Sequence, residues 1–300
     1  MKKIVIILVL SFFVLSCSNS KQTYLFTSFR EPATDGLYLA SSEDGYHWKD
    51  LGGPYLKPEA GKSKIMRDPS IVKGKNDVYH MVWTTDWKGG DGFGYASSKD
   101  LIHWSEQHYI HVMKNEPEVV NVWAPEIFYD DEQDRYIIIW ASTIPFRYAK
   151  GVEEEKNNHR MYYVTTKDFK TFSDTKLFFE PGFSVIDCVI LKKGKNDYVL
   201  VLKDNTRPMR NIKVAFGKTP LGPFSAISEP LTDYLSEGPT VLKKGNDWLI
   251  YYDNYGAKNY QAIRTSDFKN FENVSSQIKL PEGHKHGTIA TISKKNLKAL

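Results

Sequence analysis

The chain has 300 residues, of which 41% are hydrophobic, 14% aromatic and 25% charged, and its formal net charge is +4. So small an excess of positive charge produces no strong field, and we therefore expect no nucleic-acid partner. A chain of this length can bury a large core as one domain, particularly if it is all-β. No second domain is required.

The N-terminus has the composition of an export signal. Lys2 and Lys3 precede an uncharged apolar run over residues 4–15, and Ser16 and Cys17 follow it. This run of about 12 residues is shorter than the roughly 20 that span a bilayer as a helix, so we interpret it as a signal peptide. The segment Val14-Leu15-Ser16-Cys17 resembles a bacterial lipobox, in which cleavage before the cysteine leaves that cysteine carrying lipid. An ordinary secretory signal that ends near a cysteine is the alternative.

These features predict a signal peptide at residues 1–16, a lipidated tether at 17–22 that starts at Cys17, and one folded domain at 23–300. We expect an exported lipoprotein of the outer membrane, on its periplasmic or surface face, that contacts the membrane through its lipid anchor only. Removing Lys2 and Lys3 lowers the formal net charge from +4 to about +2. With Cys17 lipidated, Cys188 is the only remaining thiol, so no internal disulfide is expected.

Alternating segments rich in Val, Ile, Tyr and Trp dominate the rest of the chain. Residues 78–83 and 136–140 are examples, and their length and composition are typical of strands. We find no amphipathic stretch with helical periodicity that is long enough for a helix of consequence. The sequence therefore predicts an all-β fold.

A repeat of roughly 40 to 50 residues indicates propeller blades rather than a sandwich. Its outer half is a polar turn followed by an aromatic residue, which is expected to fill the gap between neighbouring blades. The copies lie at residues 41–48, 97–104, 165–172, 219–224 and 265–271, and they end in Trp48, Trp104, Phe172, Phe224 and Phe271. Five copies predict a five-bladed β-propeller. Trp48, Trp104, Trp83, Trp140 and Trp248 are expected in its core.

The inner half of the repeat supplies one acidic or histidine side chain near the start of a short strand in every blade. These residues are Asp68, Glu126, Asp187, Glu237 and His286. The innermost strands of a propeller begin near one face of the central channel, so we expect these five equivalent positions to form a ring. The fifth blade is split, with its inner strand at residues 286–292 and its outer strands at 23–29 and 36–41. Pairing of N- and C-terminal strands would close the ring and remove exposed sheet edges.

Four carboxylates in one ring favour a catalytic role. Clustered carboxylates repel one another, so some must have raised pKa values and remain protonated. Separated pKa values are what general acid and base catalysis requires. A purely structural alternative, in which a carboxylate accepts backbone N–H bonds at the channel mouth, explains one such residue more easily than four.

At this point the sequence resembles glycoside hydrolase family 43, and the resemblance covers nearly all of the chain after the signal peptide. The motifs that carry it, in family order, are Arg67-Asp68-Pro69, Trp123-Ala124-Pro125-Glu126, Ile186-Asp187 and Ser236-Glu237-Gly238-Pro239. The second motif departs from the pattern, because relatives more often carry aspartate where Glu126 stands.

The resemblance implies an inverting hydrolase. Asp68 would be the base that activates water, Glu237 the acid that protonates the leaving oxygen, and Asp187 the modulator that orients Glu237 and keeps it protonated. The base and acid carboxyls of such an enzyme lie roughly 6.5 to 9.5 Å apart.

The candidates for binding substrate are Glu126, Trp87, Trp123, His286 and Arg207. Trp87 lies in the loop between the second and third strands of its blade and fits neither repeated aromatic position, so its ring could stack on a sugar. A tryptophan that merely covers the loop is the alternative. The corresponding loops also carry Arg207 and Arg210, Asn254 and Tyr255, and Arg30 and Glu31. The longest loop, residues 143–160, has an acidic run at 153–155 that we expect to be a solvated surface.

The predicted chemistry requires no cofactor. A structural Ca²⁺ or Na⁺ near His286 in the central channel is an alternative to a channel without an ion, but a lone imidazole does not make a metal site.

The resemblance implies that a terminal pentose or furanose sugar is released from plant or microbial oligo- or polysaccharide, with α-L-arabinofuranosidase activity favoured over β-xylosidase or galactofuranosidase activity. One alternative is a non-catalytic glycan-binding propeller, against which the intact Asp68, Asp187 and Glu237 argue. Another is a glycosidase or phosphorylase of a different five-bladed family. Phosphorolysis needs a cationic phosphate pocket, for which Arg207 and Arg210 are the obvious candidates.

Overall fold

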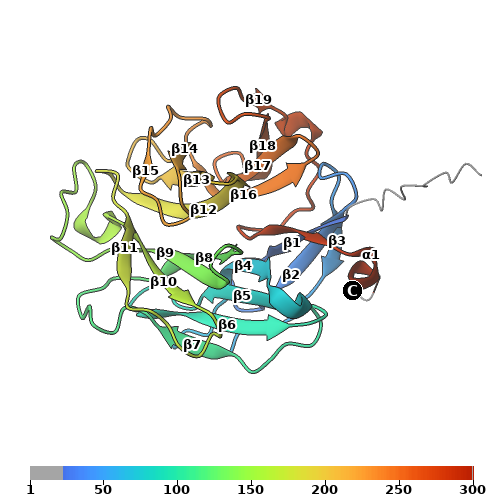
Figure 1. Ribbon diagram of the computed structural model, residues 1–300, viewed down its shortest axis with the longest axis horizontal. Coiled ribbons are helices and arrows are strands. Elements are labelled where there is room, and N and C mark those ends of the chain that lie inside the picture. Colours follow the sequence, from blue (N-terminus) through green and yellow to red (C-terminus); the bar gives the residue numbers. More distant parts are fainter. Residues whose placement is uncertain (1–22, 299) are drawn as a thin grey trace, which may run out of the picture.

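The computed structural model describes residues 23–298 and 300, and these form five four-stranded antiparallel sheets arranged as the blades of a propeller (Figure 1). Helical structure in this part of the chain is confined to one short helix and three 3₁₀ turns: α1 (Lys294–Leu297), η1 (Lys75–Asp77), η2 (Glu155–Asn157) and η3 (Ser275–Gln277). The predicted all-β, five-bladed fold is confirmed.

Blades 1 to 4 follow one another along the chain, each with its innermost strand first. Blade 1 contains β4 (Arg67–Lys73), β5 (Tyr79–Thr84), β6 (Gly92–Ser98) and β7 (His108–His111). Blade 2 contains β8 (Trp123–Asp130), β9 (Arg135–Ser142), β10 (Arg160–Thr166) and β11 (Lys176–Phe179). Blade 3 contains β12 (Val185–Gly194), β13 (Asp197–Asp204), β14 (Asn211–Gly217) and β15 (Phe224–Ser225). Blade 4 contains β16 (Ser236–Lys244), β17 (Asp247–Asn254), β18 (Asn259–Thr265) and β19 (Glu272–Asn273).

Blade 5 joins the two ends of the described chain, as predicted. Its strands are β20 (Ile289–Ile292), β1 (Thr23–Ser28), β2 (Tyr38–Ser42) and β3 (Lys49–Gly52). The red C-terminal strand lies beside the blue N-terminal strand in Figure 1, and Phe26 pairs with Ile289 across them. β20 begins three residues later than predicted, so His286 lies in the segment that leads into it.

The polar turn predicted between the third and fourth strands has the same chemistry in four blades. In blade 1, the Ser98 hydroxyl accepts the Leu101 N–H at 2.8 Å, and Asp100 accepts the His103 N–H at 2.7 Å. The pairs Ser42 and Asp44, Thr166 and Asp168, and Thr265 and Asp267 repeat this arrangement. Side chains that accept these backbone N–H groups fix the turn, which is why this part of the repeat is visible in the sequence.

The core is divided among the blade interfaces, with one hydrophobic cluster between each pair of neighbouring blades. The cluster between blades 3 and 4, for example, packs Val199 and Val201 of β13 against Ile250 and Tyr252 of β17. The other four clusters lie between blades 2 and 3, 1 and 2, 5 and 1, and 4 and 5. Both faces of each blade are therefore buried, and burial of apolar area supplies the main stabilisation of the ring.

Four of the five tryptophans predicted to lie in the core are buried there. Trp83 and Trp140 are completely buried, Trp48 and Trp248 nearly so, and Trp104 is half-buried against the cluster between blades 5 and 1. Cys188 is a buried free thiol.

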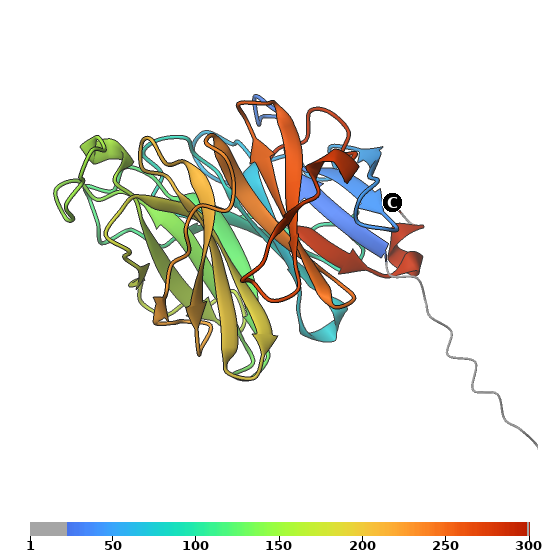
Figure 2. The same ribbon diagram turned by 90° about the horizontal axis from the view of Figure 1, so that it is seen from above.

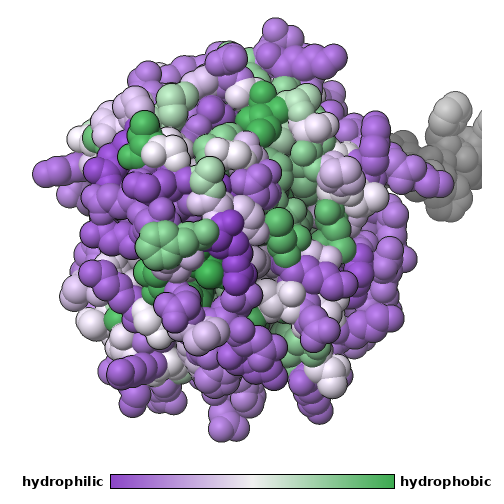
Figure 3. Space-filling view, turned by 90° about the vertical axis from the view of Figure 1, so that its left-hand side faces the viewer, coloured by the Kyte–Doolittle hydropathy of each residue, from purple (hydrophilic) through white to green (hydrophobic). Residues whose placement is uncertain are grey.

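The loops that join second to third strands share one face of the propeller, and the β9–β10 loop stands at the upper left of Figure 2. The side of the molecule that faces the viewer in Figure 3 is mostly hydrophilic, with hydrophobic side chains in small groups. Across residues 23–298 and 300, no helix is long and apolar enough to cross a bilayer. The predicted signal peptide, the lipidated Cys17 and the tether lie outside the described residues.

Candidate active site

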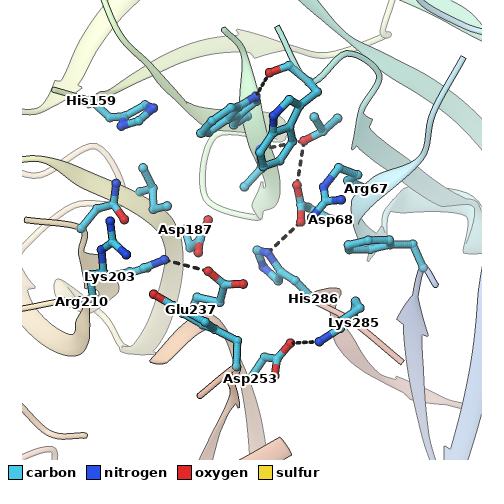
Figure 4. Close-up of a pocket in the computed structure, with 18 of the residues that line it drawn as sticks. Arg67, Asp68, His159, Asp187, Lys203, Arg210, Glu237, Asp253, Lys285 and His286 are labelled. Carbon is cyan, nitrogen blue, oxygen red and sulfur yellow. Dashed lines mark hydrogen bonds and ion pairs between the residues drawn. The ribbon is translucent and has the colours of Figure 1, made fainter. Parts of the chain in front are cut away.

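A pocket of about 550 Å³ lies where the five innermost segments meet the loop face. Asp68, Asp187 and Glu237 line it, as do His286, Trp87 and Trp123. Figure 4 shows Asp187, Glu237 and His286 close together, with Asp68 beside His286. The structure thus brings together the three predicted catalytic carboxyls and three of the predicted binding residues. Glu126 and Arg207 are not among the lining residues.

The innermost strands of blades 1 to 4 carry a β-bulge at the pocket. Their pairing with the second strands shifts between Arg67 and Ser70, Trp123 and Glu126, Ile186 and Val189, and Glu237 and Thr240. In each bulge one residue has a positive φ: Asp68 at 52°, Ala124 at 46°, Asp187 at 51° and Gly238 at 57°. Bulges re-aim side chains and are common beside active sites.

This register corrects the prediction that the five ring residues are equivalent. Asp68 and Asp187 share the positive-φ position, whereas Glu237 precedes that position by one residue and Glu126 follows it by two. Glu126 therefore matches Ser70 and Thr240, which direct their side chains into the contact between blades: the Ser70 hydroxyl accepts the Ile127 N–H, and that of Thr240 accepts the Ile289 N–H. A bulge adds a residue without changing the sequence pattern, so spacing alone could not reveal the offset.

Asp68 is held as an ionised carboxylate. Thr84 donates to its Oδ2 at 2.9 Å, and His286 Nδ1 lies 3.2 Å from its Oδ1. Burial acts to raise the pKa of Asp68, but the hydrogen bond and charge of His286, together with Arg67 and Thr84, lower it below its ordinary value. A buried carboxylate that stays charged at neutral pH can accept a proton from water.

Glu237 is bound on one oxygen by a buried lysine. Lys203 of β13, whose side chain is 3% exposed, donates from Nζ to Glu237 Oε2 at 2.8 Å. Burial acts to lower the pKa of Lys203, but Glu237 and Asp187 raise it above its ordinary value, so the lysine is charged. The contact holds the Glu237 carboxyl through Oε2.

Asp187 is the most deeply buried of the three carboxyls. Its Oδ2 accepts the Gly238 N–H at 3.0 Å, which links blades 3 and 4. Burial raises the pKa of Asp187, and the charges of Glu237 and Asp68 act in the same direction against His286 and Lys203. Asp68 and Asp187 therefore have pKa values displaced in opposite directions, the arrangement that separates protonation states in one site.

His286 ties the base to this network. Burial acts to lower its pKa, but the hydrogen bond to Asp68 and the charges of Asp187, Asp68 and Glu126 raise the pKa of His286 to about 9. It is therefore an imidazolium at neutral pH, and its ring nitrogen donates to Asp68. Gly238 packs directly on this ring, since a Cβ there would lie 2.6 Å from His286 Cγ.

An aromatic wall forms another side of the pocket. The rings of Trp87 and Trp123 are stacked with centroids 4.7 Å apart, and Trp123 Nε1 donates to the Trp87 carbonyl at 3.0 Å. His159 continues the stack, 5.2 Å from the Trp123 ring. Trp87 is 49% exposed, and the Arg67 guanidinium lies over its ring, 4.8 Å from the ring centroid.

Glu126 does not line the pocket and lies beside Thr288, which is in the segment that leads into β20. Thr288 donates weakly to its Oε2 at 3.5 Å. Burial raises the pKa of Glu126 to about 7, against the opposing effects of Ser70, His286 and Thr288.

Arg207 is turned away from the pocket toward the β9–β10 loop. Its guanidinium lies 3.2 Å from Glu154, and its backbone N–H donates to Glu153 Oε1 at 2.5 Å. The expectation of a solvated acidic run is wrong for Glu153, which is 1% exposed because it ties this loop to the β13–β14 loop. Arg207 and Arg210 therefore do not form a joint phosphate pocket.

Several lining residues were missed by the sequence analysis. They include Thr84, His159, Lys203, Asp253 and Lys285. Asp253 accepts from Lys285 Nζ at 2.9 Å, and both Lys203 and Asp253 lie opposite first-strand residues that line the pocket. The available signal was a charged residue near the end of an otherwise apolar second strand.

Among the described residues, no group of three or more His, Cys, Asp or Glu side chains is arranged to hold a metal ion. The channel ion near His286 stays a sequence-based prediction.

The fold and the site together define a five-bladed β-propeller with a carboxylate-lined pocket on its axis. A family model described as a "probable glycosyl hydrolase domain", related to glycoside hydrolase family 43, matches residues 19–298. The chain belongs to this family 43-related group, as the motifs predicted.

An α-L-arabinofuranosidase of Bifidobacterium longum subsp. longum is 26% identical over 199 residues, which are 57% of this chain and 18% of that protein. The chain thus spans less than a fifth of the length of that relative.

Solved structures share the fold. An α-L-arabinofuranosidase from Clostridium thermocellum has a TM-score of 0.60 at 13% identity, with 87% of this chain and 93% of that chain covered. An α-L-arabinofuranosidase from Lactobacillus brevis has a TM-score of 0.54 at 17% identity, with 70% and 72% covered. An exo-β-1,3-galactanase from Phanerochaete chrysosporium has a TM-score of 0.55 at 12% identity, with 69% and 49% covered.

Proposed function

We propose that this protein is an inverting glycoside hydrolase that releases a terminal pentose or furanose sugar from oligo- or polysaccharide. The observation that carries the proposal is the convergence of Asp68, Asp187 and Glu237 in one pocket, each in a different electrostatic setting. Membership of the family supports a carbohydrate substrate.

Each carboxyl has a role that suits its setting. Asp68 stays ionised and accepts a proton from the water that attacks the anomeric carbon. Glu237, which is hydrogen-bonded to Lys203, donates the proton of its carboxyl to the leaving oxygen. Asp187 supplies negative charge near Glu237 and binds the Gly238 N–H, which sets the position of the strand that carries the acid. The base-to-acid separation expected for inversion remains part of the proposal.

The first sugar to test is α-L-arabinofuranose. The Bifidobacterium relative and two of the solved structures are named as α-L-arabinofuranosidases. β-Xylosides and galactofuranosides follow, because the motifs are shared among these activities.

The test is hydrolysis of 4-nitrophenyl glycosides by protein that starts after Cys17. We expect wild type to release nitrophenol from the arabinofuranoside, and Asp68→Ala to lose roughly a thousandfold or more in kcat. Glu237→Ala should retain more activity than Asp68→Ala, because nitrophenolate leaves with little protonation. Glu118→Ala, which removes an exposed carboxyl outside the pocket, is the matched control and should keep wild-type rates.

Binding of polysaccharide fragments distinguishes a glycoside hydrolase from a non-catalytic glycan-binding propeller. Wild type that binds arabinan or galactan fragments but turns over no glycoside would contradict the hydrolase and favour a glycan-binding propeller. NMR of the released sugar measures its anomeric configuration during the reaction. A product that retains the configuration of the substrate would contradict inversion.

We also propose that the chain is exported and anchored through lipid on Cys17, at the outer membrane. The lipobox-like segment 14–17 supports this. Cells that express the full chain and are fed a radiolabelled fatty acid should label wild type, whereas Cys17→Ser should be unlabelled and should leave the membrane fraction. Labelling that persists in Cys17→Ser would contradict the anchor.

A further inference from the structure

Each cation that lines the pocket, with one exception, forms a salt bridge with an acidic side chain. Four cations each lie beside an acid: Arg67 beside Glu31 at 2.8 Å, Lys203 beside Glu237 at 2.8 Å, Lys285 beside Asp253 at 2.9 Å and His286 beside Asp68 at 3.2 Å. The fifth cation, Arg210, makes no salt bridge to any residue of 23–298 or 300.

Arg210 is exceptional on the scale of the whole described chain. The other seven arginines, Arg30, Arg67, Arg135, Arg147, Arg160, Arg207 and Arg264, each pair with a carboxylate. Arg210 Nε is in addition buried without a hydrogen-bond acceptor within the part of the chain that the structure describes. A guanidinium has five N–H donors, and leaving one of them buried without an acceptor is unfavourable.

The backbone holds Arg210 in place at a further cost. Its φ of 40° is unfavourable for a side chain with a Cβ. The Arg210 N–H donates to the Thr206 carbonyl at 3.2 Å, and the Arg210 carbonyl accepts the Ser236 N–H at 3.0 Å, one residue before Glu237. The loop that presents the arginine is therefore fixed to the strand that carries the predicted acid.

Arg210 lines the same pocket as the predicted acid Glu237. Figure 4 shows Arg210 beside Lys203, on the Glu237 side of the pocket. Tyr255 lies over Lys203, with the ammonium 5.4 Å from the ring centroid, so this side is walled by protein.

The charge balance of the working state points the same way. Five cations and five acids line the pocket: Arg67, Lys203, Arg210, Lys285 and His286 against Glu31, Asp68, Asp187, Glu237 and Asp253. If Glu237 carries the proton that an acid catalyst needs and the other nine groups are ionised, one positive charge is left over. A negative charge on the substrate would compensate it.

We propose that Arg210 binds the carboxylate of an acidic sugar, a uronic acid residue, in the substrate. The planar guanidinium fork matches a carboxylate and can donate two parallel hydrogen bonds to it. This proposal rests on the proposed function, because it takes the ligand of the pocket to be a sugar.

The test is direct binding, which does not require turnover. Dissociation constants are measured by ligand-observed NMR for methyl glucuronide and methyl galacturonide and for the neutral methyl glucoside and galactoside. We expect wild type to prefer the uronides by about tenfold or more, as for a hydrogen bond to a charged group. Arg210→Met should remove this preference, and Arg210→Lys should retain part of it because the charge remains without the fork.

Arg207→Met is the matched control, since it removes an arginine three residues away that lies outside the pocket. It should leave the preference for uronides intact. Melting temperatures identify a variant that fails to fold, and Arg210→Gln then replaces Arg210→Met as the neutral variant. Equal affinities for uronides and neutral sugars in wild type, or a preference that survives in the neutral variant, would overturn the proposal. Tighter binding of methyl galactoside 6-sulfate than of either uronide would overturn the carboxylate in favour of a sulfate ester.

The two proposals fail separately. Absence of nitrophenol release with an Arg210-dependent preference for uronides would reject the hydrolase and keep the acidic-sugar site. Arabinofuranoside hydrolysis without any preference for uronides would reject the acidic-sugar site and keep the hydrolase.

Discussion

At the scale of single residues, Gly238 meets two demands that no other residue type meets. Its φ of 57° is left-handed, and a Cβ would lie 2.6 Å from the His286 ring. Gly238→Ala should therefore displace His286 and cost more than the roughly 1–2 kcal/mol of the left-handed conformation alone. We expect kcat/KM to fall about tenfold or more, because His286 binds Asp68 and the Gly238 N–H binds Asp187. Chemical denaturation and the nitrophenyl assay measure the two effects.

Gly245 provides the matched control. Its φ of 61° is similar, but nothing lies within 4 Å of an added Cβ, and it belongs to the β16–β17 turn away from the pocket. Gly245→Ala should lower the stability only by the cost of the left-handed conformation, and it should leave kcat/KM unchanged. Equal losses of stability in the two variants would show that the contact with His286 is not the reason for glycine at 238.

The individual residues that the sequence revealed are those embedded in motifs. Asp68, Asp187 and Glu237 were found because short patterns surround them. Lys203 was not, since its partner Glu237 is 34 residues away on another blade and no local pattern joins them. Arg210 was named only as one of several loop residues, because the absence of an acidic partner is a property of the folded chain.

At the scale of the secondary-structure elements, the sequence predicted the strands well and their inner register poorly. The polar turns that repeat in four blades are local chemistry, and local chemistry is visible in the sequence. The bulges are different, because each shifts the side chains that follow to other directions. The prolines at 69, 125 and 239 are the signal that could have revealed them, since proline cannot supply a ladder N–H.

The register of β8 leads to a pH prediction for Glu126. Its pKa is raised to about 7 by burial, well above the value of a solvated glutamate. A raised acid pKa means that the folded state holds a proton that the unfolded state has lost, so stability falls as the pH rises from about 4.5 to about 7. Glutamine does not titrate, so the stability of Glu126→Gln should not fall in this way as the pH rises. Unfolding free energies at pH 4, 6 and 8 should diverge in favour of the variant by up to about 3 kcal/mol.

The same variant tests the position of Glu126. Because this residue does not line the pocket, Glu126→Gln should leave KM for the nitrophenyl glycoside close to that of wild type. A KM raised about tenfold or more, without loss of stability, would instead support the substrate contact that the sequence predicted.

At the scale of the whole molecule, ring closure couples the ends of the chain to the pocket. The sequence predicted this because the repeat is complete only when its last inner strand is combined with its first outer strands. In the structure β20 pairs with β1, Ile289 packs in the cluster between blades 4 and 5, and Ile292 packs in the cluster between blades 5 and 1. The closing strand thus stabilises two of the five blade interfaces.

Two C-terminal truncations separate the closing strand from the short helix that follows it. Ending the chain at Gly287 removes β20 and α1 but keeps Lys285 and His286, and it exposes the edge of β1 and the apolar residues that β20 covered. We expect this protein to aggregate or to lose its single cooperative melting transition. Ending the chain at Ser293 removes α1, with the Asn296 bond to Tyr79 and the packing of Leu297, and keeps the ring closed. Its melting temperature should fall by only several degrees, at about 2–4 °C for each kcal/mol lost. Indistinguishable melting of the two truncated proteins would show that β20 does not close the ring cooperatively, and that the helix rather than the strand secures the C-terminus.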